Sequence, residues 1–134
     1  TKGSAVITIT PDASVRDLVV LLKEHNLGAV VVSSDGAALD GIVSERDVVR
    51  SLADDAAVLS ASVGEVMTAG VHTCHPNDSV ESLMSTMTKH RIRHLPVVDE
   101  DDHLCGIVSI GDVVKSTITQ LEFERDQLQG YVSG

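Results

Sequence analysis

The sequence predicts a mixed α/β (α+β) fold made of two pseudo-symmetric halves, each a small sheet with two helices. The first observation is an internal repeat: a shift of 65 residues aligns positions 11–50 with positions 76–115 without a gap and gives 14 identities in 40 pairs. Two copies in one register indicate a pseudo-symmetric pair and not a solenoid. The second is that 43% of the 134 residues are hydrophobic while 1% are aromatic, so the shared core is expected to be aliphatic.

Each half opens with alternating apolar residues, at 6–10 and 71–75, which predict short strands that end at a proline. A helix follows in each half. Ser14 and Ser79 are placed as N-caps, and the apolar residues after them recur at i, i+3, i+4 and i+7. Gly28 is expected to end the first helix in a left-handed conformation.

A hairpin follows in each half, because two β-rich runs flank a polar turn. The second helix of each half is expected to begin after Ser44 or Ser109, which completes the order strand, helix, strand, strand, helix. Neither half could bury both faces of its sheet alone. The predicted hairpin strands lie at 29–32, 39–43, 95–98 and 104–108.

The repeat sets the expected domain boundaries: a first repeat with its connector at 1–60, a second repeat at 61–120 and a helical C-terminal extension at 121–134. The Ala and Asp content of residues 51–67 predicts a helical or irregular connector. The helical pattern continues from residue 112 to 128 and carries an apolar stripe. We interpret this stripe as a dimer contact, and packing back onto its own domain is the alternative. Its members are Val114, Ile118, Leu121 and Leu128.

Charge and composition exclude several classes of protein. The chain carries 10 Lys and Arg against 20 Asp and Glu, a net charge of −10, which disfavours binding to nucleic acids and to anionic membranes. Because no apolar run could span a bilayer and no signal-peptide pattern is present, we expect a soluble cytoplasmic protein. Cys74 and Cys105 are expected to be reduced.

Two identical strings, Gly-Ile-Val-Ser-x-x-Asp at 41–47 and 106–112, could carry chemistry. Each places a hydroxyl and a carboxylate on the first turn of a helix, where free backbone N–H groups point the same way. The carboxylate can accept hydrogen bonds from both ribose hydroxyls, while the serine and the amides contact phosphate. Helix capping is the competing interpretation. The tetrad at 14–17 has the same spacing and is interpreted as a cap only, but recurrence after an identical strand favours a nucleotide site.

These strings, with Val63-Gly64-Glu65-Val66-Met67-Thr68 before the second repeat and the segment 90–98, resemble the cystathionine-β-synthase (CBS) domain family, whose repeats pair in a Bateman module. The resemblance runs from about Val6 to Ile118. It implies a non-catalytic regulatory module in signal transduction that needs no cofactor. The implied ligands are adenosine compounds, with AMP first among them, then ADP, ATP, NAD(H) or S-adenosylmethionine, bound in two clefts between the repeats. No effector protein is indicated.

The resemblance also implies the residues of the two sites. Asp47 and Asp112 would hold the ribose hydroxyls, with Ser44 and Ser109 beside ribose or phosphate. Adenine would lie against the opening strands and the start of each hairpin, where backbone amides read its edge. The cations differ between the copies, so the sites are expected to be unequal and to prefer monophosphates or dinucleotides over ATP. The other implied contacts are Ile7, Thr8, Gly28, Ala29, Val30, Arg46, Thr73, Cys74, Arg93, His94, Leu95 and Pro96. The start departs from the family, because Lys2 and Gly3 stand where the second repeat has Met67 and Thr68.

Two other functions remain open. One is an interaction scaffold in which both Ser-x-x-Asp tetrads only cap helices. The other is a metal- or redox-responsive protein that uses its cysteines and histidines. A metal site is not expected, because His72 and His75 would project to opposite faces of a strand, and Pro96 indicates that the helix ends between His90 and His94. The acidic turn at 99–102 is interpreted as a solvated loop, and no motif of an enzyme is present.

Overall fold

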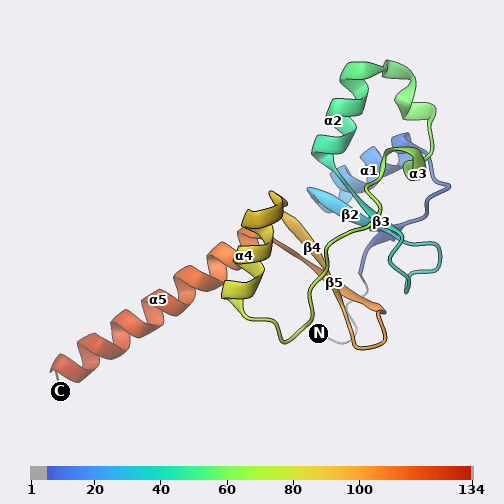
Figure 1. The fold of residues 1–134 in the computed structure, drawn as a ribbon. Coiled ribbons are helices and arrows are strands. Elements are labelled where there is room, and N and C mark those ends of the chain that lie inside the picture. Colours follow the sequence, from blue (N-terminus) through green and yellow to red (C-terminus); the bar gives the residue numbers. More distant parts are fainter. Residues whose placement is uncertain (1–5, 134) are drawn as a thin grey trace. The chain divides into compact units, whose positions relative to one another are not determined.

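The structure is a computed structural model that describes residues 6–133, with side chains up to residue 128 (Figure 1). The atypical start at Lys2 and Gly3 lies outside the described residues. Helices and strands alternate as the repeat predicts, which confirms the mixed α/β class. The elements in chain order are β1 (Thr8–Ile9), α1 (Val15–His25), β2 (Ala29–Val32), β3 (Gly41–Ser44), α2 (Glu45–Asp54), the 3-10 helix η1 (Ala56–Ser60), α3 (Val63–Val66), α4 (Val80–His90), β4 (His94–Val98), β5 (Leu104–Ser109) and α5 (Ile110–Ser133).

The chain divides into two compact units, which are described separately. Unit 1 runs to Pro76 and includes Pro96–Ile107, and unit 2 comprises Asn77–Leu95 and the residues from Val108 on. In unit 1, β1, β2 and β3 form a sheet in that order. β1 pairs parallel to β2, and β2 pairs antiparallel to β3. The first predicted hairpin is therefore confirmed, and β4 and β5 form the second as a two-stranded sheet.

The core of unit 1 joins one face of the sheet to α1. The apolar stripe of α1 supplies Val15, Leu18 and Leu22, which are at most 6% exposed, and neighbouring strands supply buried valines. Each fully buried aliphatic side chain contributes about 1.5–3 kcal/mol relative to exposure. The other members of the buried cluster are Ile9, Val30, Val32, Val43, Val48 and Val63.

The first helix of each half begins as predicted but ends differently. Ser14 Oγ accepts a hydrogen bond from Asp17 N at 3.0 Å, and Ser79 caps α4 in the same way. The expectation that Gly28 ends α1 is wrong: Asn26 takes the left-handed conformation, with φ 54°, and its N–H bonds carbonyls of the last turn. Asparagine tolerates this conformation better than most residues. Arg91, which is 65 positions later, ends α4 in the same conformation.

The predicted opening strand at 71–75 is wrong. Only Cys74 pairs there, through a single parallel bridge to Val97 with hydrogen bonds from Cys74 N to Pro96 O and from Val98 N to Cys74 O. His72 and Thr73 are exposed, so the alternation in the sequence is not matched by alternating burial. The opening strand of the second repeat is thereby reduced to one bridge.

The second strand of the first hairpin starts two residues later than predicted. Ser34 donates from both its backbone N and its Oγ to Asp40 Oδ2, at 2.7 and 2.6 Å. These bonds keep residues 34–40 in a loop, and β3 begins at Gly41. These hydrogen bonds to the Asp40 side chain therefore prevent the strand from extending through Leu39.

The connector is helical, as predicted, and is tied to unit 1. Val63 N donates to Ala13 O at 2.8 Å, and the Val63 side chain is fully buried. Beyond α3, Ile42 N donates to Thr68 O at 3.0 Å and Thr68 N donates to Ile42 O at 2.9 Å. The connector thus extends the edge of the first sheet.

Two turn aspartates have structural roles. Asp35 Oδ1 accepts hydrogen bonds from Ala38 N at 2.8 Å and Ala37 N at 2.9 Å. The bond from Ala38, then that from Ala37, lowers the pKa of Asp35 below its usual value of 3.8. The backbone hydrogen bond from His103 likewise lowers the pKa of Asp99.

These shifts predict a pH-dependent contribution to stability. A carboxylate whose pKa is lowered by folding stabilises the native state above its unfolded pKa, and the contribution is lost as pH falls through the folded value. Asp35→Asn is therefore expected to lower the melting temperature at pH 7, and the difference from wild type should shrink below about pH 3.8. Melting curves from pH 7 to pH 2.5 measure this. Asp12→Asn, the same change at another exposed aspartate, is the control, and an Asp35→Asn difference that stays constant with pH would contradict the prediction.

In unit 2, α4 packs beside the first turns of α5 (Figure 1). The apolar stripe of α5 does not pack back onto the domain: Val114 is 42% exposed, Ile118 51%, Leu121 59% and Leu128 66%. The alternative of packing back is therefore wrong for these side chains. None of the helices within residues 6–133 is long and apolar enough to cross a membrane.

Candidate functional site

The first Ser-x-x-Asp tetrad forms a reciprocal capping box at the start of α2. Asp47 N donates to Ser44 Oγ at 3.2 Å, and Ser44 N donates to Asp47 Oδ2 at 2.9 Å. The carboxylate is half-buried and lies where the partial positive charge of the helix N-terminus favours an anion. Capping therefore fixes the position of the acid.

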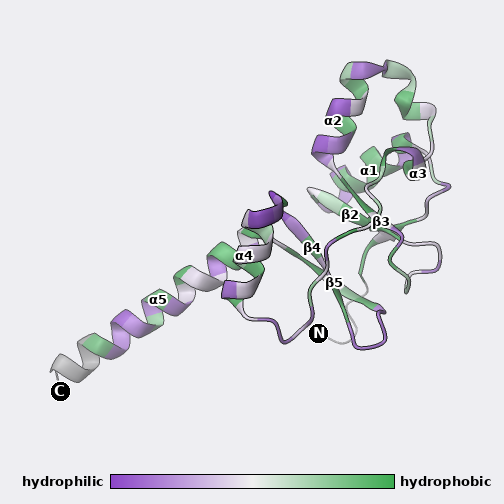
Figure 2. Ribbon diagram, viewed as in Figure 1, coloured by the Kyte–Doolittle hydropathy of each residue, from purple (hydrophilic) through white to green (hydrophobic). Residues whose placement is uncertain are grey.

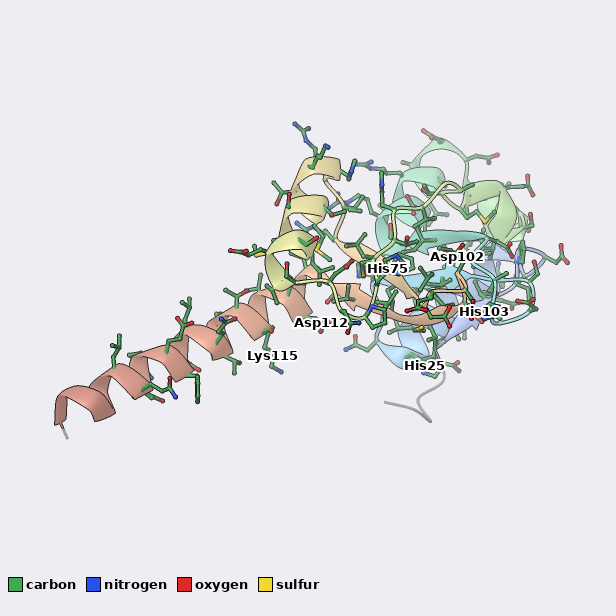
Figure 3. All side chains as sticks on the ribbon, turned by 60° about the horizontal axis from the view of Figure 1, so that its bottom comes forward. His25, His75, Asp102, His103, Asp112 and Lys115 are labelled. Atoms are coloured by element: carbon green, nitrogen blue, oxygen red, sulfur yellow. The ribbon has the colours of Figure 1, made fainter. Side chains whose placement is uncertain are left out.

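The second tetrad repeats this geometry at the start of α5. Asp112 N donates to Ser109 Oγ at 3.1 Å, and Ser109 N donates to Asp112 Oδ2 at 3.0 Å. Asp112 is exposed, and Figure 3 shows it on the first part of α5 with Lys115 nearby on the same helix. The two halves thus present the same carboxylate in the same bonded state.

Capping and ligand binding do not exclude each other here. In each aspartate the capping bond uses Oδ2, and no group among the described residues donates to Oδ1 of Asp47 or Asp112. An ionised carboxylate that is fixed through one oxygen can accept further hydrogen bonds on the other. The tetrad at 14–17 differs: Asp17 N donates to Ser14 Oγ, but no bond runs from Ser14 N to the Asp17 carboxylate. It is capped on one side only, in line with its interpretation as a plain cap.

The sheet of unit 1 brings the predicted residues of the first site to one end. Ala29 is the register partner of Ser44, and Glu45 N donates to Gly28 O at 2.9 Å. β1 runs parallel to β2 with Thr8 opposite Val31, so Ile7 precedes that pair at the same end of the sheet.

Three residues of the first site differ in what they can offer. Arg46 is exposed beside Asp47 on the first turn of α2. The side chains of Ala29 and Val30 are 4% and 1% exposed. Val30 belongs to the core, so any part of Val30 in binding falls to its backbone.

In unit 2, the second site repeats the bond between strand and helix. Ile110 N donates to Arg93 O at 2.8 Å, which is the counterpart of the bond from Glu45 to Gly28 in the first half. Arg93 is exposed, His94 is half-buried and Leu95 is fully buried. The bond places the Arg93 backbone beside the residue that follows Ser109, and His94 and Leu95 come next in β4.

The remaining predicted residues, Thr73, Cys74 and Pro96, belong to unit 1. Cys74 is 4% exposed and bonds the Pro96 carbonyl through its N–H, whereas Thr73 is exposed. Cys74 is buried and Cys105 is exposed, and neither is in a disulfide in the structure; that both are reduced stays a prediction.

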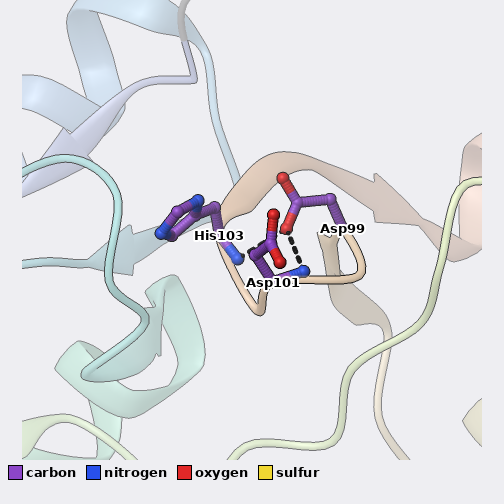
Figure 4. Close-up of side chains that lie close together, drawn as sticks. All are labelled: Asp99, Asp101 and His103. Carbon is purple, nitrogen blue, oxygen red and sulfur yellow. Dashed lines mark hydrogen bonds between the residues drawn. The ribbon is translucent and has the colours of Figure 1, made fainter.

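A group of metal-ligating side chains occurs in the turn between β4 and β5. The ligand atoms of Asp99, Asp101 and His103 lie within 4.8 Å of one another. Figure 4 shows the three side chains around this turn. Asp99 Oδ1 already accepts hydrogen bonds from Asp101 N and His103 N, both at 2.9 Å. We assign Asp99 the role of stabilising the turn, a role that the interpretation of 99–102 as a solvated loop did not foresee.

Lys115 is not among the site residues predicted from the sequence. Its ammonium is the only Lys or Arg charge on the shallow surface that adjoins Asp112, and the spacing i, i+3 from Asp112 could have indicated it. The surface is lined by Asp112, Lys115, Ser116, Thr119, Gln120 and Phe123.

Comparisons with known proteins agree with the repeat. The family model described as "CBS domain" matches twice, at residues 3–54 and 63–118. A mitochondrial CBS domain-containing protein of Arabidopsis thaliana, CBSX3, is 38% identical over 130 residues, which are 93% of this chain and 63% of that protein. The crystal structure of a CBS-domain protein of Agrobacterium tumefaciens, ATU1752, is 43% identical with a TM-score of 0.79 and covers 84% of this chain and 89% of that one.

Two similar structures contain adenosine compounds. The CBS domain protein PAE2072 of Pyrobaculum aerophilum is complexed with AMP. It is 26% identical, has a TM-score of 0.73 and covers 81% of this chain and 83% of that one. The CBS domain pair of protein MJ0100 is in complex with 5-methylthioadenosine and S-adenosyl-L-methionine. It is 26% identical, has a TM-score of 0.79 and covers 87% of this chain and 91% of that one.

Proposed function

Because the chain belongs to the CBS domain family, we propose that it is a non-catalytic regulatory module that binds an adenosine-containing ligand at the capped aspartates of its two repeats. The observation that carries the proposal is that Asp47 and Asp112 are each held through Oδ2 and keep Oδ1 for a ligand. Similar CBS domain structures contain AMP or S-adenosyl-L-methionine, which supports the choice of adenosine compounds.

In the proposed complex, the ribose hydroxyls make the main hydrogen bonds to the protein. The two vicinal hydroxyls donate to the carboxylate of Asp47, and the capping box keeps the acceptor oriented before the ligand arrives. Hydrogen bonds to a charged acceptor contribute about 1.5–3 kcal/mol each. Adenine lies against the aliphatic end of the sheet near Ile7 and Ala29, where apolar walls take the place of aromatic stacking.

AMP is the proposed ligand among the adenosine compounds. Few cations lie near the capped aspartates: Arg46 is next to Asp47, and Arg93 and Lys115 belong to the part of unit 2 that holds Asp112. So few cations suit a monophosphate better than a triphosphate, particularly on a chain with a net charge of −10.

The regulatory output follows from linkage. A ligand that prefers one arrangement of the module shifts the population toward it and stabilises it by mass action. We further propose that the output involves a second copy of the chain and that the protein works in the cytoplasm. Two cysteines without a disulfide fit a reducing compartment.

Calorimetric titration of the purified, nucleotide-free chain tests the proposal. AMP is expected to bind, and at 100 times its dissociation constant to stabilise the fold by about 2.7 kcal/mol. ADP, ATP, NAD, NADH and S-adenosylmethionine form the comparison series, and GMP is the control for the base. If none of the adenosine compounds binds, the interpretation as a scaffold without ligand replaces this one.

A further inference from the structure

α5 carries a surface stripe with a regular heptad spacing. Val114, Ile118, Leu121, Arg125 and Leu128 follow one another at intervals of four, three, four and three residues. This is the a/d spacing of a coiled coil, with Ile118 and Arg125 at a positions and the other three at d positions. All five are exposed, and the one ion pair that a member of the stripe makes among the described residues joins Arg125 to its sequence neighbour Asp126, at 3.2 Å. The four apolar members are therefore open to a partner. We call these five residues the seam.

The seam is distinct from the face that α5 uses within its own unit. Val113, which is 2% exposed, and the half-buried Thr117 lie on the inward face, and Thr117 Oγ1 donates to Val113 O at 3.0 Å. Apolar residues recur along α5 well past the turns beside α4, between charged ones (Figure 2). The helix is 24 residues long, about 36 Å, so it offers several layers to a partner.

We propose that the seam pairs with the seam of a second copy in an antiparallel two-stranded coiled coil. Helices with an a/d repeat are self-complementary, because each seam residue inserts between residues of the facing helix. A second copy therefore supplies seam partners for Val114, Ile118, Leu121 and Arg125. The inference rests on α5 and does not depend on ligand binding.

Arg125 decides the orientation. In a parallel pair each a residue faces the same a residue of its partner, so two Arg125 guanidinium groups would meet in the seam and repel each other. In an antiparallel pair a positions face d positions. Arg125 then faces Val114 of the partner subunit, and its charged end reaches solvent while its alkyl stem packs.

Charges beside the seam select the register. With Ile118 opposite Leu121 of the partner subunit, Lys115 lies across from Glu122 of the partner subunit, and the dyad generates this pair twice. A shift of one heptad in one direction brings the two Glu122 side chains together, and a shift in the other direction brings the two Lys115 side chains together. Only the register centred between Ile118 and Leu121 pairs opposite charges.

Light scattering coupled to size-exclusion chromatography tests the seam. The wild-type chain is expected to be a dimer at 100 µM, and the Ile118→Glu, Leu121→Glu double variant a monomer, because four carboxylates would meet in the central layers. Phe123→Ser is the matched control, since Phe123 is 60% exposed but lies on the opposite side of α5. It should stay dimeric. A monomeric wild-type chain would show that the seam does not bind a second copy and would overturn the proposal. A double variant that stays dimeric would overturn it as well.

Disulfide cross-linking tests the orientation in a Cys105→Ser background. In the antiparallel register the two Leu128 positions lie about 25 Å apart along the axis, so Leu128→Cys should not cross-link. Val114→Cys combined with Arg125→Cys should give cross-linked dimers, because these positions face each other. Rapid cross-linking of Leu128→Cys would show a parallel pair and contradict the proposal. AMP titration of the double glutamate variant separates the two proposals, because ligand binding should survive loss of the dimer.

Discussion

Replacing Asp47 and Asp112 together by alanine is expected to abolish AMP binding, and Asp47→Ala alone to weaken binding at the first site about 100- to 10,000-fold. The estimate follows from losing a charged acceptor of hydrogen bonds from ribose, each worth about 1.5–3 kcal/mol, since 1.4 kcal/mol is a factor of ten. Calorimetry with AMP measures the effect. The single variants also report whether the two sites have unequal affinities, as Arg46, Arg93 and His94 lead us to expect.

The control for this prediction is Asp17→Ala. Asp17 shares the Ser-x-x-Asp spacing, but its carboxylate makes no bond to Ser14 N, so its removal should leave binding unchanged. Asp47→Ala and Asp112→Ala each remove one half of a capping box, at a cost of about 0.5–2 kcal/mol of stability. Binding is therefore measured well below the melting temperature of each variant. Wild-type affinity in the Asp47→Ala, Asp112→Ala double variant would assign the tetrads to capping alone.

The second large effect is expected at a pair of equivalent glycines. A Cβ at Gly41 would lie 2.7 Å from Met67 Sδ and 2.8 Å from Thr68 O, whereas a Cβ at Gly106 meets no described atom within 4 Å. The Met67 side chain can move aside, but the Thr68 carbonyl is held by Ile42 N. Gly41→Ala is therefore expected to destabilise the fold by about 1–3 kcal/mol, the usual cost of overpacking.

Gly106→Ala is the matched control, since it makes the same chemical change at the position 65 residues later. Its free energy of unfolding should stay within about 0.5 kcal/mol of wild type. Urea denaturation of the two variants measures the difference. Equal losses of stability in both variants would show that the cost comes from glycine itself and not from the approach of residues 67 and 68.

The internal repeat made most of the fold predictable. Ser14, Ser44, Ser79 and Ser109 precede helices in the sequence, and each precedes a helix in the structure, because a side-chain acceptor at that place satisfies N–H groups that the helix leaves unbonded. The capped aspartates were predictable for the same reason. What the sequence could not decide was whether capping would use both carboxylate oxygens or leave one for a ligand.

Other features of the fold correspond to no periodic pattern in the sequence. Arg91 in a left-handed conformation is unusual for a residue with a Cβ, so glycine was the natural expectation for a helix end. The bridge between Ile42 and Thr68 joins two single residues that are far apart in the chain, and no local pattern marks such a pair. The predicted strand at 71–75 does not form. An alternating pattern gives a strand only where other residues cover its apolar side, and in this segment Cys74 alone is buried.

The attachment of the connector to the first sheet determines where the chain can be dissected. A fragment that stops after η1 would lack Val63, which belongs to the core, and Thr68, which forms the bridge to Ile42. Ile42 itself lies two residues before Ser44. A boundary near Gly70, which is exposed and has a φ of 63°, keeps both contacts. An isolated first repeat intended for binding studies should therefore carry the whole connector at its C-terminus.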